Sequence, residues 1–333
     1  MPDPRGHPAF SDISTFLHLP WVYEPEAIRA ARPDVAIVGA PFDVAVTHRP
    51  GARFGPRAIR AASYLTTGAF HHLGLRIEPF DHLTGIDAGD AFCVPGDIER
   101  GHEGIREKLR ELLSVAPECV PLVLGGDHSI TYPSAGTIAD HYDRKVGIVH
   151  FDAHADAADA SWGVSLSHGT PMRRLIEAGH VAGKNFVQVG LRGYWPPPDV
   201  LAWMAEQGMR SHFMSEIEER GFDTVLHEAI EQALDGVDRI YLSVDIDVLD
   251  PAFAPGTGTP EPGGLSAREL LRAVRQIALS VPIVALDVVE VSPPYDSAGI
   301  TAEVAHRVCC EAISALAVRK RDNKPPNHRR LLA

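Results

Sequence analysis

Cysteine is scarce in this chain of 333 residues, which contains four of them. They stand at positions 93, 119, 309 and 310 and form neither a C-x-x-C pair nor a zinc-binding spacing. A disulfide framework and a cysteine-ligated metal site are therefore excluded, and we expect reduced thiols, as in a cytoplasmic protein. The adjacent pair Cys309 and Cys310 is expected to lie half buried on a helix.

Long hydrophobic runs are also missing. No segment approaches the roughly 18 apolar residues that a membrane-spanning helix needs. The N-terminus, with Asp3, Arg5 and several prolines, lacks the apolar core and the cleavage signature of a secretory signal. These features predict a soluble, cytoplasmic protein with no membrane partner.

The chain also has no excess of positive charge, since its formal net charge is -13. Nucleic-acid binding requires clustered positive charge, so nucleic acid is not expected as the main partner. A small cationic molecule fits this charge better. The hydrophobic content of 45% and the charged content of 23% are ordinary for a globular protein.

Short apolar runs alternate with segments of helical periodicity along the whole chain. Strands are predicted at residues 35–39, 83–88, 121–124, 146–149, 185–190, 239–244 and 282–288. Helices are predicted from about residue 56 and over 101–115, 171–178, 224–234 and 302–318, with one more beginning after Gly125-Gly126. This alternation predicts an α/β fold with a mainly parallel sheet.

Polar side chains follow four of the predicted strands. Asp152, His154 and Asp156 come directly after the run 146–149, and alternate residues of an extended backbone point to the same side. Three further groups follow strand ends, at Asp127 and His128, at Asp245 and Asp247, and at Glu290. Ligands of open α/β sheets bind beyond the carboxyl ends of the strands. Because these groups come from both halves of the chain, we expect one domain over 33–318, with an irregular arm at 1–32 and a basic tail at 319–333.

The polar groups form a ligand set of four carboxylates and two imidazoles, namely His128, Asp152, His154, Asp156, Asp245 and Asp247. Six protein ligands are too many for one ion that must also bind water or substrate, so two divalent ions fit better. Two such ions can lower the pKa of a water molecule from about 15.7 toward neutrality. Oxygen and nitrogen ligands favour Mn²⁺, and Ni²⁺, Co²⁺ and Fe²⁺ stay open.

Taken together, these motifs resemble those of the ureohydrolase family, which includes arginases and agmatinases. The resemblance covers residues 34–318 and rests on the motifs GGDHS at 125–129, DAHAD at 152–156, SHGT at 167–170, SVDIDVLDP at 243–251 and DVVEV at 287–291. It implies a three-layer α/β/α domain, two manganese ions, and a trimer or hexamer of identical chains, or a hetero-oligomer with a paralogue. The implied reaction is hydrolysis of a C–N bond in a guanidino compound, which gives urea and an amine.

The resemblance also implies a role for each site residue. Asp152 and Asp245 would bridge the two ions, with His128 and Asp156 completing one site and His154 and Asp247 the other. Glu290 would hold the guanidinium group through paired hydrogen bonds, and His168 would carry a proton to the departing amine. Asp127 is either an orienter of His128 or a turn-forming residue, and His150 has a packing or supporting role.

The substrate is the least constrained prediction. Its far end should be recognised by the loops 157–166 and 191–197, where Trp162 offers an apolar or cation–π surface. The first loop has no basic residue for a carboxylate, which favours agmatine, hydrolysed to putrescine. Guanidinobutyrate, proclavaminate-type substrates, guanidine, alkylguanidines and biguanides such as metformin, for which Ni²⁺ could be the metal, stay open. So do a deacetylase-like amidase and a non-catalytic subunit.

Overall fold

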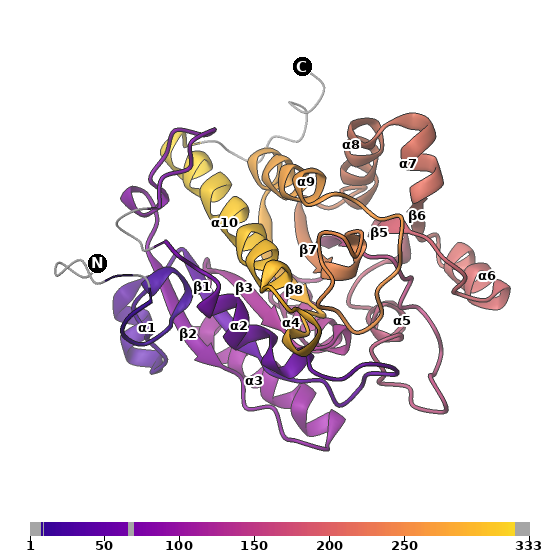
Figure 1. The fold of residues 1–333 in the computed structure, drawn as a ribbon, viewed down its shortest axis with the longest axis horizontal. Coiled ribbons are helices and arrows are strands. Elements are labelled where there is room, and N and C mark those ends of the chain that lie inside the picture. Colours follow the sequence, from indigo (N-terminus) through magenta and orange to yellow (C-terminus); the bar gives the residue numbers. More distant parts are fainter. Residues whose placement is uncertain (1–7, 9, 66–69, 324–333) are drawn as a thin grey trace.

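The protein is a single α/β domain built around one eight-stranded parallel sheet (Figure 1), and its computed structural model describes residues 8, 10–65 and 70–323. The strand order is β2-β1-β3-β8-β7-β4-β5-β6, and every neighbouring pair is parallel. The strands are β1 (Val35–Ala40), β2 (Gly85–Asp90), β3 (Val120–Gly125), β4 (Val146–Phe151), β5 (Phe186–Leu191), β6 (Arg210–Phe213), β7 (Arg239–Asp245) and β8 (Ile283–Val289).

Helices cover both faces of the sheet and give the three layers. One layer contains α2 (Gly55–Ala61), α7 (Met214–Arg220), α8 (Phe222–Ala233), α9 (Ala267–Ser280) and α10 (Ile300–Arg321). The other contains α1 (Pro25–Ala31), α3 (Ile98–Val115), α4 (Thr131–His141), α5 (Pro171–Glu177) and α6 (Pro198–Glu206). Every residue of β1, β4 and β5 is buried, because a central parallel strand is covered on both faces.

Helix α9 shows how the sequence specifies such a layer. Ser266 and Glu269 form a reciprocal capping box that fixes the start of the helix. Leu270, Val274 and Ile277 recur at helical spacing and bury one face of α9 against the sheet side of the core. The α/β/α fold and its parallel sheet are therefore confirmed.

Three expectations about the periphery are wrong. The arm at 1–32 is not irregular, because its described part includes a short 3-10 helix at Phe16–His18 and α1. The basic tail does not begin at 319, since α10 continues to Arg321, and Arg319 donates a hydrogen bond to the carbonyl of Leu279 at 3.0 Å. Residues 1–7, 9 and 324–333 lie outside the described part. Cys309 and Cys310 are fully buried, not half buried.

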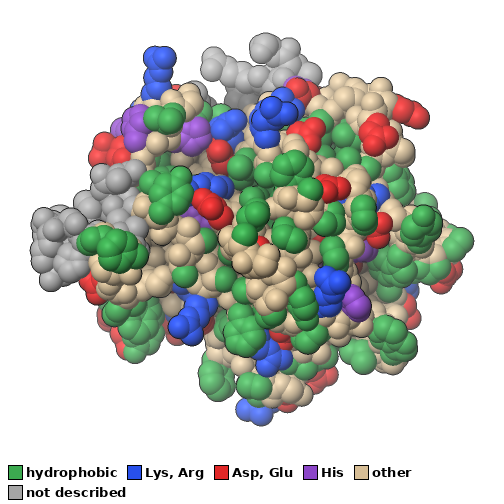
Figure 2. All heavy atoms as spheres, viewed as in Figure 1, with side chains coloured by type: hydrophobic (Ala, Val, Ile, Leu, Met, Phe, Trp, Pro, Cys, Tyr) green, Lys and Arg blue, Asp and Glu red, His purple; other side chains and the backbone are tan. Residues whose placement is uncertain are grey.

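Five elements were not predicted from the sequence, namely α1, α6, α7, α9 and β6, although α9 begins with a capping box and shows helical periodicity. Among the described residues, no helix combines the length and the apolar character that crossing a bilayer requires. On the face shown in Figure 2, hydrophobic, acidic and basic side chains are interspersed.

The sheet order explains where a site can form. Strands β3, β8, β7 and β4 are consecutive neighbours in the middle of the sheet. Their carboxyl ends deliver, side by side, the polar groups at 126–128, 290, 245–247 and 152–156. Four groups that are far apart in the sequence thus meet at one edge, as expected for parallel α/β sheets.

Candidate metal centre and active site

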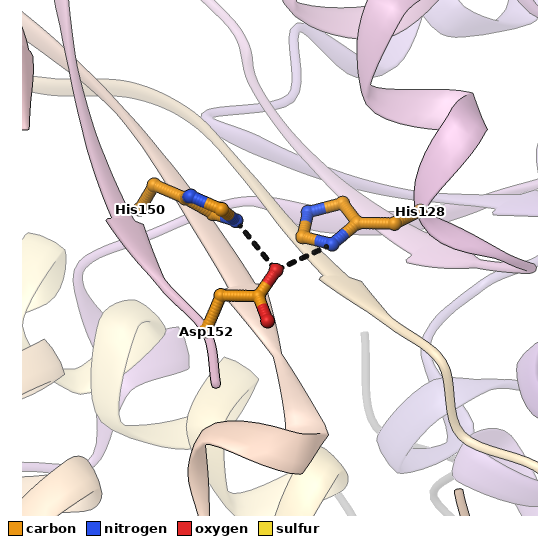
Figure 3. Close-up of side chains that lie close together, drawn as sticks. All are labelled: His128, His150 and Asp152. Atoms are coloured by element: carbon orange, nitrogen blue, oxygen red, sulfur yellow. Dashed lines mark hydrogen bonds and ion pairs between the residues drawn. The ribbon is translucent and has the colours of Figure 1, made fainter. Parts of the chain in front are cut away.

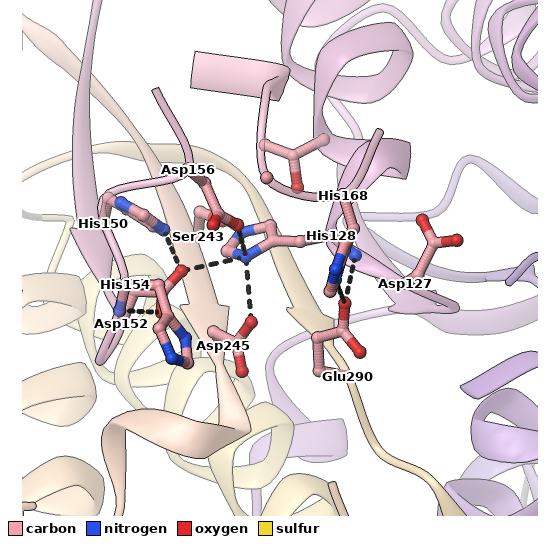
Figure 4. Close-up of polar contacts among 12 residues, drawn as sticks. Asp127, His128, His150, Asp152, His154, Asp156, His168, Ser243, Asp245 and Glu290 are labelled. Carbon is pink, nitrogen blue, oxygen red and sulfur yellow. Dashed lines mark hydrogen bonds and ion pairs between the residues drawn. The ribbon is translucent and has the colours of Figure 1, made fainter. Parts of the chain in front are cut away.

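His128 lies at the centre of the polar cluster, with its ring fully buried (Figure 4). Its Nε2 atom lies 3.0 Å from the hydroxyl of Ser243 on β7. This contact directs the other ring nitrogen, Nδ1, toward carboxylate oxygens of three aspartates, at 3.0 Å for Asp152, 3.1 Å for Asp156 and 2.9 Å for Asp245.

The surroundings of His128 Nδ1 require a positive charge. Although three carboxylate oxygens lie within 3.1 Å of this buried nitrogen, none of them is aligned to form a hydrogen bond with it. Burial and the neighbouring carboxylates Asp247 and Asp152 raise the pKa of Asp245 well above its usual range, which shows how unfavourable several buried carboxylates are together. A bound cation removes this repulsion, because its positive charge stabilises the ionised form of the carboxylates around it. The donor set therefore fits a divalent ion.

Among the described residues, potential ligand atoms that all lie within 4.8 Å of one another form three overlapping sets. One of them consists of His128, His150 and Asp152 and includes the supporting His150. The other two are the candidate ion sites and are called the first and the second set. The first set contains His128, Asp152, Asp156 and Asp245, and the second contains Asp152, His154 and Asp247. Asp152 belongs to both sets, as expected of a bridging ligand. Asp245 belongs to the first set only, and its Oδ1 atom accepts the backbone N–H of Asp247 at 2.8 Å. The geometry thus places the two implied bridging residues in unequal positions.

Backbone N–H groups position the second set. The N–H of His154 donates to Oδ1 of Asp152 at 2.6 Å, and the N–H of Ala153 donates to Oδ1 of Asp247 at 3.2 Å. The ring of His154 faces Asp247, with 3.0 Å between Nδ1 and Oδ2. Asp156 follows with a φ of 47°, a left-handed conformation that turns its side chain back toward His128.

His150 supports Asp152 from within strand β4 (Figure 3). Its Nε2 atom lies 2.8 Å from Oδ2 of Asp152. Its Nδ1 atom faces the side-chain nitrogen of Gln188 at 3.1 Å, and this nitrogen also donates to the carbonyl of Ala155 at 2.7 Å. Because an amide nitrogen only donates, Nδ1 is the acceptor and Nε2 carries the proton. His150 therefore orients a candidate ligand, which agrees with its expected supporting role.

Glu290 lies beside the ligand cluster and has one free oxygen. Its Oε1 atom accepts the backbone N–H of His128 at 2.9 Å and lies 3.0 Å from Nδ1 of His168. Its Oε2 atom is buried without a hydrogen-bond partner. Burial acts to raise the pKa of Glu290, but the hydrogen bonds and charges of His168 and His128 together outweigh it and lower the pKa below the usual value. The result is a buried carboxylate with an unused acceptor, suited to a planar cation.

His168 is held from both sides. Opposite Glu290, its Nε2 atom lies 2.7 Å from the hydroxyl of Thr47 and accepts the backbone N–H of Thr47 at 3.1 Å. Burial acts to lower the pKa of His168, but Glu290, together with the charges of Asp156 and Asp127, outweighs it and raises the pKa to about 9. The backbone N–H of Thr47 acts in the opposite sense, because it requires an unprotonated Nε2.

Asp127 lies behind these groups and uses both carboxylate oxygens. Its Oδ2 atom accepts the N–H of Ala45 at 3.0 Å, and its Oδ1 atom accepts the N–H and the hydroxyl of Ser129 at 3.0 and 2.5 Å. Burial and the nearby charge of Glu290 raise the pKa of Asp127 to about 7. This geometry favours positioning of the loop at Ala45 over direct contact with a reacting group.

A cavity of about 480 Å³ opens above the cluster. The residues that line it are Thr47, His154, Asp156, Ala158, Ala160, Ser161, Trp162, His168, Gly169, Trp195, Asp245 and Thr259. Trp162 is highly exposed at the rim, and both loops that were predicted to face the substrate contribute residues. Among the described residues that line the cavity, none is lysine or arginine.

Three residues of the site escaped the sequence analysis. Ser243 shares strand parity with Asp245, so alternation along β7 could have identified it. Thr47 and Thr259 lie in loops, where no periodicity indicates which side chains face a cavity. Thr259 donates a hydrogen bond to Oδ2 of Asp247 at 3.3 Å.

The parallel α/β fold and the buried cluster of carboxylates and imidazoles at its strand ends identify a candidate metal centre. A model of the Arginase family matches residues 33–315, so the chain belongs to that family and is a hydrolase acting on C–N bonds. The proclavaminate amidinohydrolase of Streptomyces clavuligerus is 38% identical over 93% of this chain and 95% of its own length. Its structure matches with a TM-score of 0.84 over 93% of this chain and 99% of that one.

Other relatives differ in the substrate that their names give. The guanidinopropionase of Pseudomonas aeruginosa is 41% identical over 93% of both chains. The mitochondrial agmatinase of Gallus gallus is 40% identical over 85% of this chain and 81% of its own length. Similarity alone therefore does not separate an amine substrate from an acid substrate.

Proposed function

We propose that the protein hydrolyses a guanidino compound whose far end carries no carboxylate, with agmatine as the leading candidate, converted to urea and putrescine. The observation that supports this proposal is the described cavity lining, which contains two tryptophans but neither lysine nor arginine. A guanidino acid would bring a carboxylate into this space without a cation to pair with it. The ammonium group of agmatine can instead lie over the tryptophan faces.

The proposed metal cofactor is a pair of divalent cations, with Mn²⁺ first and Ni²⁺, Co²⁺ or Fe²⁺ as alternatives. His128, Asp152, Asp156 and Asp245 would hold one ion, and Asp152, His154 and Asp247 the other. Cations bound there supply the Lewis acidity that makes water a nucleophile near neutral pH. Ser243 and His150 support this centre by fixing the orientation of His128 and Asp152.

Among the residues of the chain, Glu290 is assigned to binding the substrate and His168 to supplying a proton. Oε2 of Glu290 accepts N–H groups of the guanidinium and holds its plane at the cluster. The guanidinium carbon is a poor electrophile because resonance spreads its charge, so a fixed orientation matters for the attack. His168 provides the proton that the departing amine needs. Asp127 keeps the loop before Thr47 in place through Ala45.

A second candidate is a neutral or alkylated guanidine, or a biguanide such as metformin. The flat apolar surfaces of Trp162 and Trp195 at the cavity favour this candidate, since they suit a substituent without formal charge as well as a cation. Nickel is the metal to test with these substrates. A non-catalytic subunit is disfavoured, because all six candidate ligands are present and converge on one site.

Urea release from agmatine, arginine, 4-guanidinobutyrate, guanidine and metformin at equal concentration tests the proposal, after loading with Mn²⁺ or Ni²⁺. We expect kcat/KM, which measures discrimination, to be highest for agmatine. A preference of more than about tenfold for arginine or for a guanidino acid, roughly 1.4 kcal/mol, would exclude agmatine as the preferred substrate. No urea from any compound, together with no bound metal, would favour the non-catalytic subunit.

Three further expectations stay predictions. Residues 33–318 should form the catalytic unit, which urea release by a chain limited to these residues would test. The assembly should be a homo-oligomer, trimer or hexamer, or a hetero-oligomer with a paralogue. Light scattering on the purified protein would give the mass of that assembly, and cell fractionation would test the expected cytoplasmic location.

A further inference from the structure

Neither ring nitrogen of His168 faces the cavity freely. Its Nδ1 atom lies 3.0 Å from Oε1 of Glu290, and its Nε2 atom lies 2.7 Å from the hydroxyl of Thr47. The His168 side chain is only 10% exposed. A proton that leaves Nε2 in this geometry meets the Thr47 hydroxyl first.

Thr47 lines the cavity and is held firmly by its loop. The carboxylate of Asp43 is buried and accepts the N–H of Gly51 at 2.7 Å, and it also pairs with the side chain of Arg53. Between Asp43 and Thr47, Ala45 donates its N–H to Asp127 and accepts the N–H of His168 at 3.1 Å. Thr47 and His168 are thus fixed to one another through backbone as well as side-chain contacts.

The two contacts of Thr47 suit two protonation states of His168. The backbone N–H only donates, so it stabilises the neutral ring with an unprotonated Nε2. The hydroxyl can accept as well as donate, so it can also take a proton from the charged ring. The charged groups that act on this ring are Glu290, Asp127 and Asp156, which all favour its charged form.

We propose that the Thr47 hydroxyl relays the proton from His168 to the leaving amine, an inference that rests on the proposed function. The Nε2 proton of charged His168 passes to Oγ1 of Thr47, while the Oγ1 proton passes to the leaving nitrogen as its bond to the guanidinium carbon breaks. Thr47 ends neutral with its hydroxyl restored. His168 ends neutral, with its remaining proton on Nδ1 facing Glu290 and with Nε2 accepting the backbone N–H of Thr47.

The test compares Thr47→Val, which removes the hydroxyl but keeps the shape and the backbone N–H, with Thr47→Ser, which keeps the hydroxyl. We expect Thr47→Val to lower kcat about 10²-fold, the lower end of the range for a lost acid/base step, with KM and metal content unchanged. Thr47→Ser should stay within about threefold of the wild type. The loss of kcat in Thr47→Val should be smaller with an arylguanidine as substrate, because an arylamine leaves the guanidinium carbon with less need for a proton.

Three results would overturn the relay: a Thr47→Val kcat within about threefold of the wild type, a change in KM alone, or an equal defect with the arylguanidine. If the wild type releases urea, the proposed function holds and these three results concern the relay alone. The relay is judged by the ratio of the kcat of the variant to that of the wild type. An independent readout uses ¹⁵N-histidine NMR of the metal-free protein, with the His168 signals assigned through His168→Asn. The pKa of His168 should fall in Thr47→Val, and an unchanged pKa would contradict the proposed acceptor.

Discussion

The base of the site and its rim differ in almost every physical respect. At the base, His128 and Asp152 are completely buried; His128 lies 3.0 Å from Ser243 on β7, and the N–H of Asp152 donates to the carbonyl of Val189 on β5 at 3.2 Å. At the rim, Trp162 is 86% exposed, and Tyr194, beside the cavity-lining Trp195, is completely exposed. The base is thus fixed by the sheet, whereas the rim depends on loops. We infer that the two regions separate the chemistry from the choice of substrate.

The largest effect should come from Asp152→Asn, which removes charge from the residue shared by both ligand sets. We expect loss of both metal ions and a fall in turnover of roughly 10³-fold, more than the 10- to 100-fold typical of an outer-shell partner. Elemental analysis and urea release measure both. Asp159→Asn, a neighbouring exposed aspartate, is the matched control and should keep two ions.

Asp245→Asn tests whether Asp245, unlike Asp152, serves only one of the two ions at the base. Asp245 belongs to one ligand set, so this variant should retain the ion held by Asp152, His154 and Asp247. One ion per chain is the expected result. Loss of both ions would instead make Asp245 a second bridge, as the family resemblance implied.

A smaller effect is expected for His168→Ala, which leaves the ligands intact. Turnover should fall by about 10² to 10⁴ with two ions retained, as for other lost acid/base groups. Glu290, together with Asp156 and Asp127, raises the pKa of His168 to about 9, so its acidic form is present below that pH and is lost above it. The wild-type kcat should therefore fall above about pH 9, and His168→Ala should lack this limb. An unchanged turnover at neutral pH would remove the proton-transfer role.

The smallest effect should come from the rim. Trp162→Ala removes an exposed cation–π surface worth about 0.5–1 kcal/mol, which corresponds to roughly a two- to fivefold lower kcat/KM for agmatine. Metal content and the kcat for guanidine, which has no tail, should not change. A loss of metal in this variant would contradict the inference that the rim selects the substrate and the base carries the chemistry.

Sequence patterns indicated the residues at the base of the site because polar residues directly after an apolar run mark the end of a buried strand. Apolar runs followed by alternating polar residues identified Asp152, His154, Asp156 and Asp245, and the structure brings them together. Ser243 followed the same parity but was overlooked, because a serine in a buried strand is chemically unremarkable. The fold class was likewise predictable from the alternation of strands and helices.

Loop contacts were not predictable. Thr47 reaches His168 across 121 positions of sequence, and nothing in the local pattern marks it. Asp127 was a candidate because it precedes His128, but only its buried contacts to Ala45 and Ser129 distinguish a positioning residue from a simple turn. The irregular character of the arm and the start of the tail failed as predictions for another reason, because α1 buries Ile28 in the core and the end of α10 is held by hydrogen bonds to Leu279 and Asp34.

Titration of the chelator-treated protein with Mn²⁺, followed by urea release from agmatine, tests the central claim most directly. The claim is that residues from four neighbouring strand ends form one two-metal hydrolytic site. We predict no urea release without metal and a plateau at two equivalents per chain. Full turnover at one equivalent, or turnover in the metal-free protein, would contradict it.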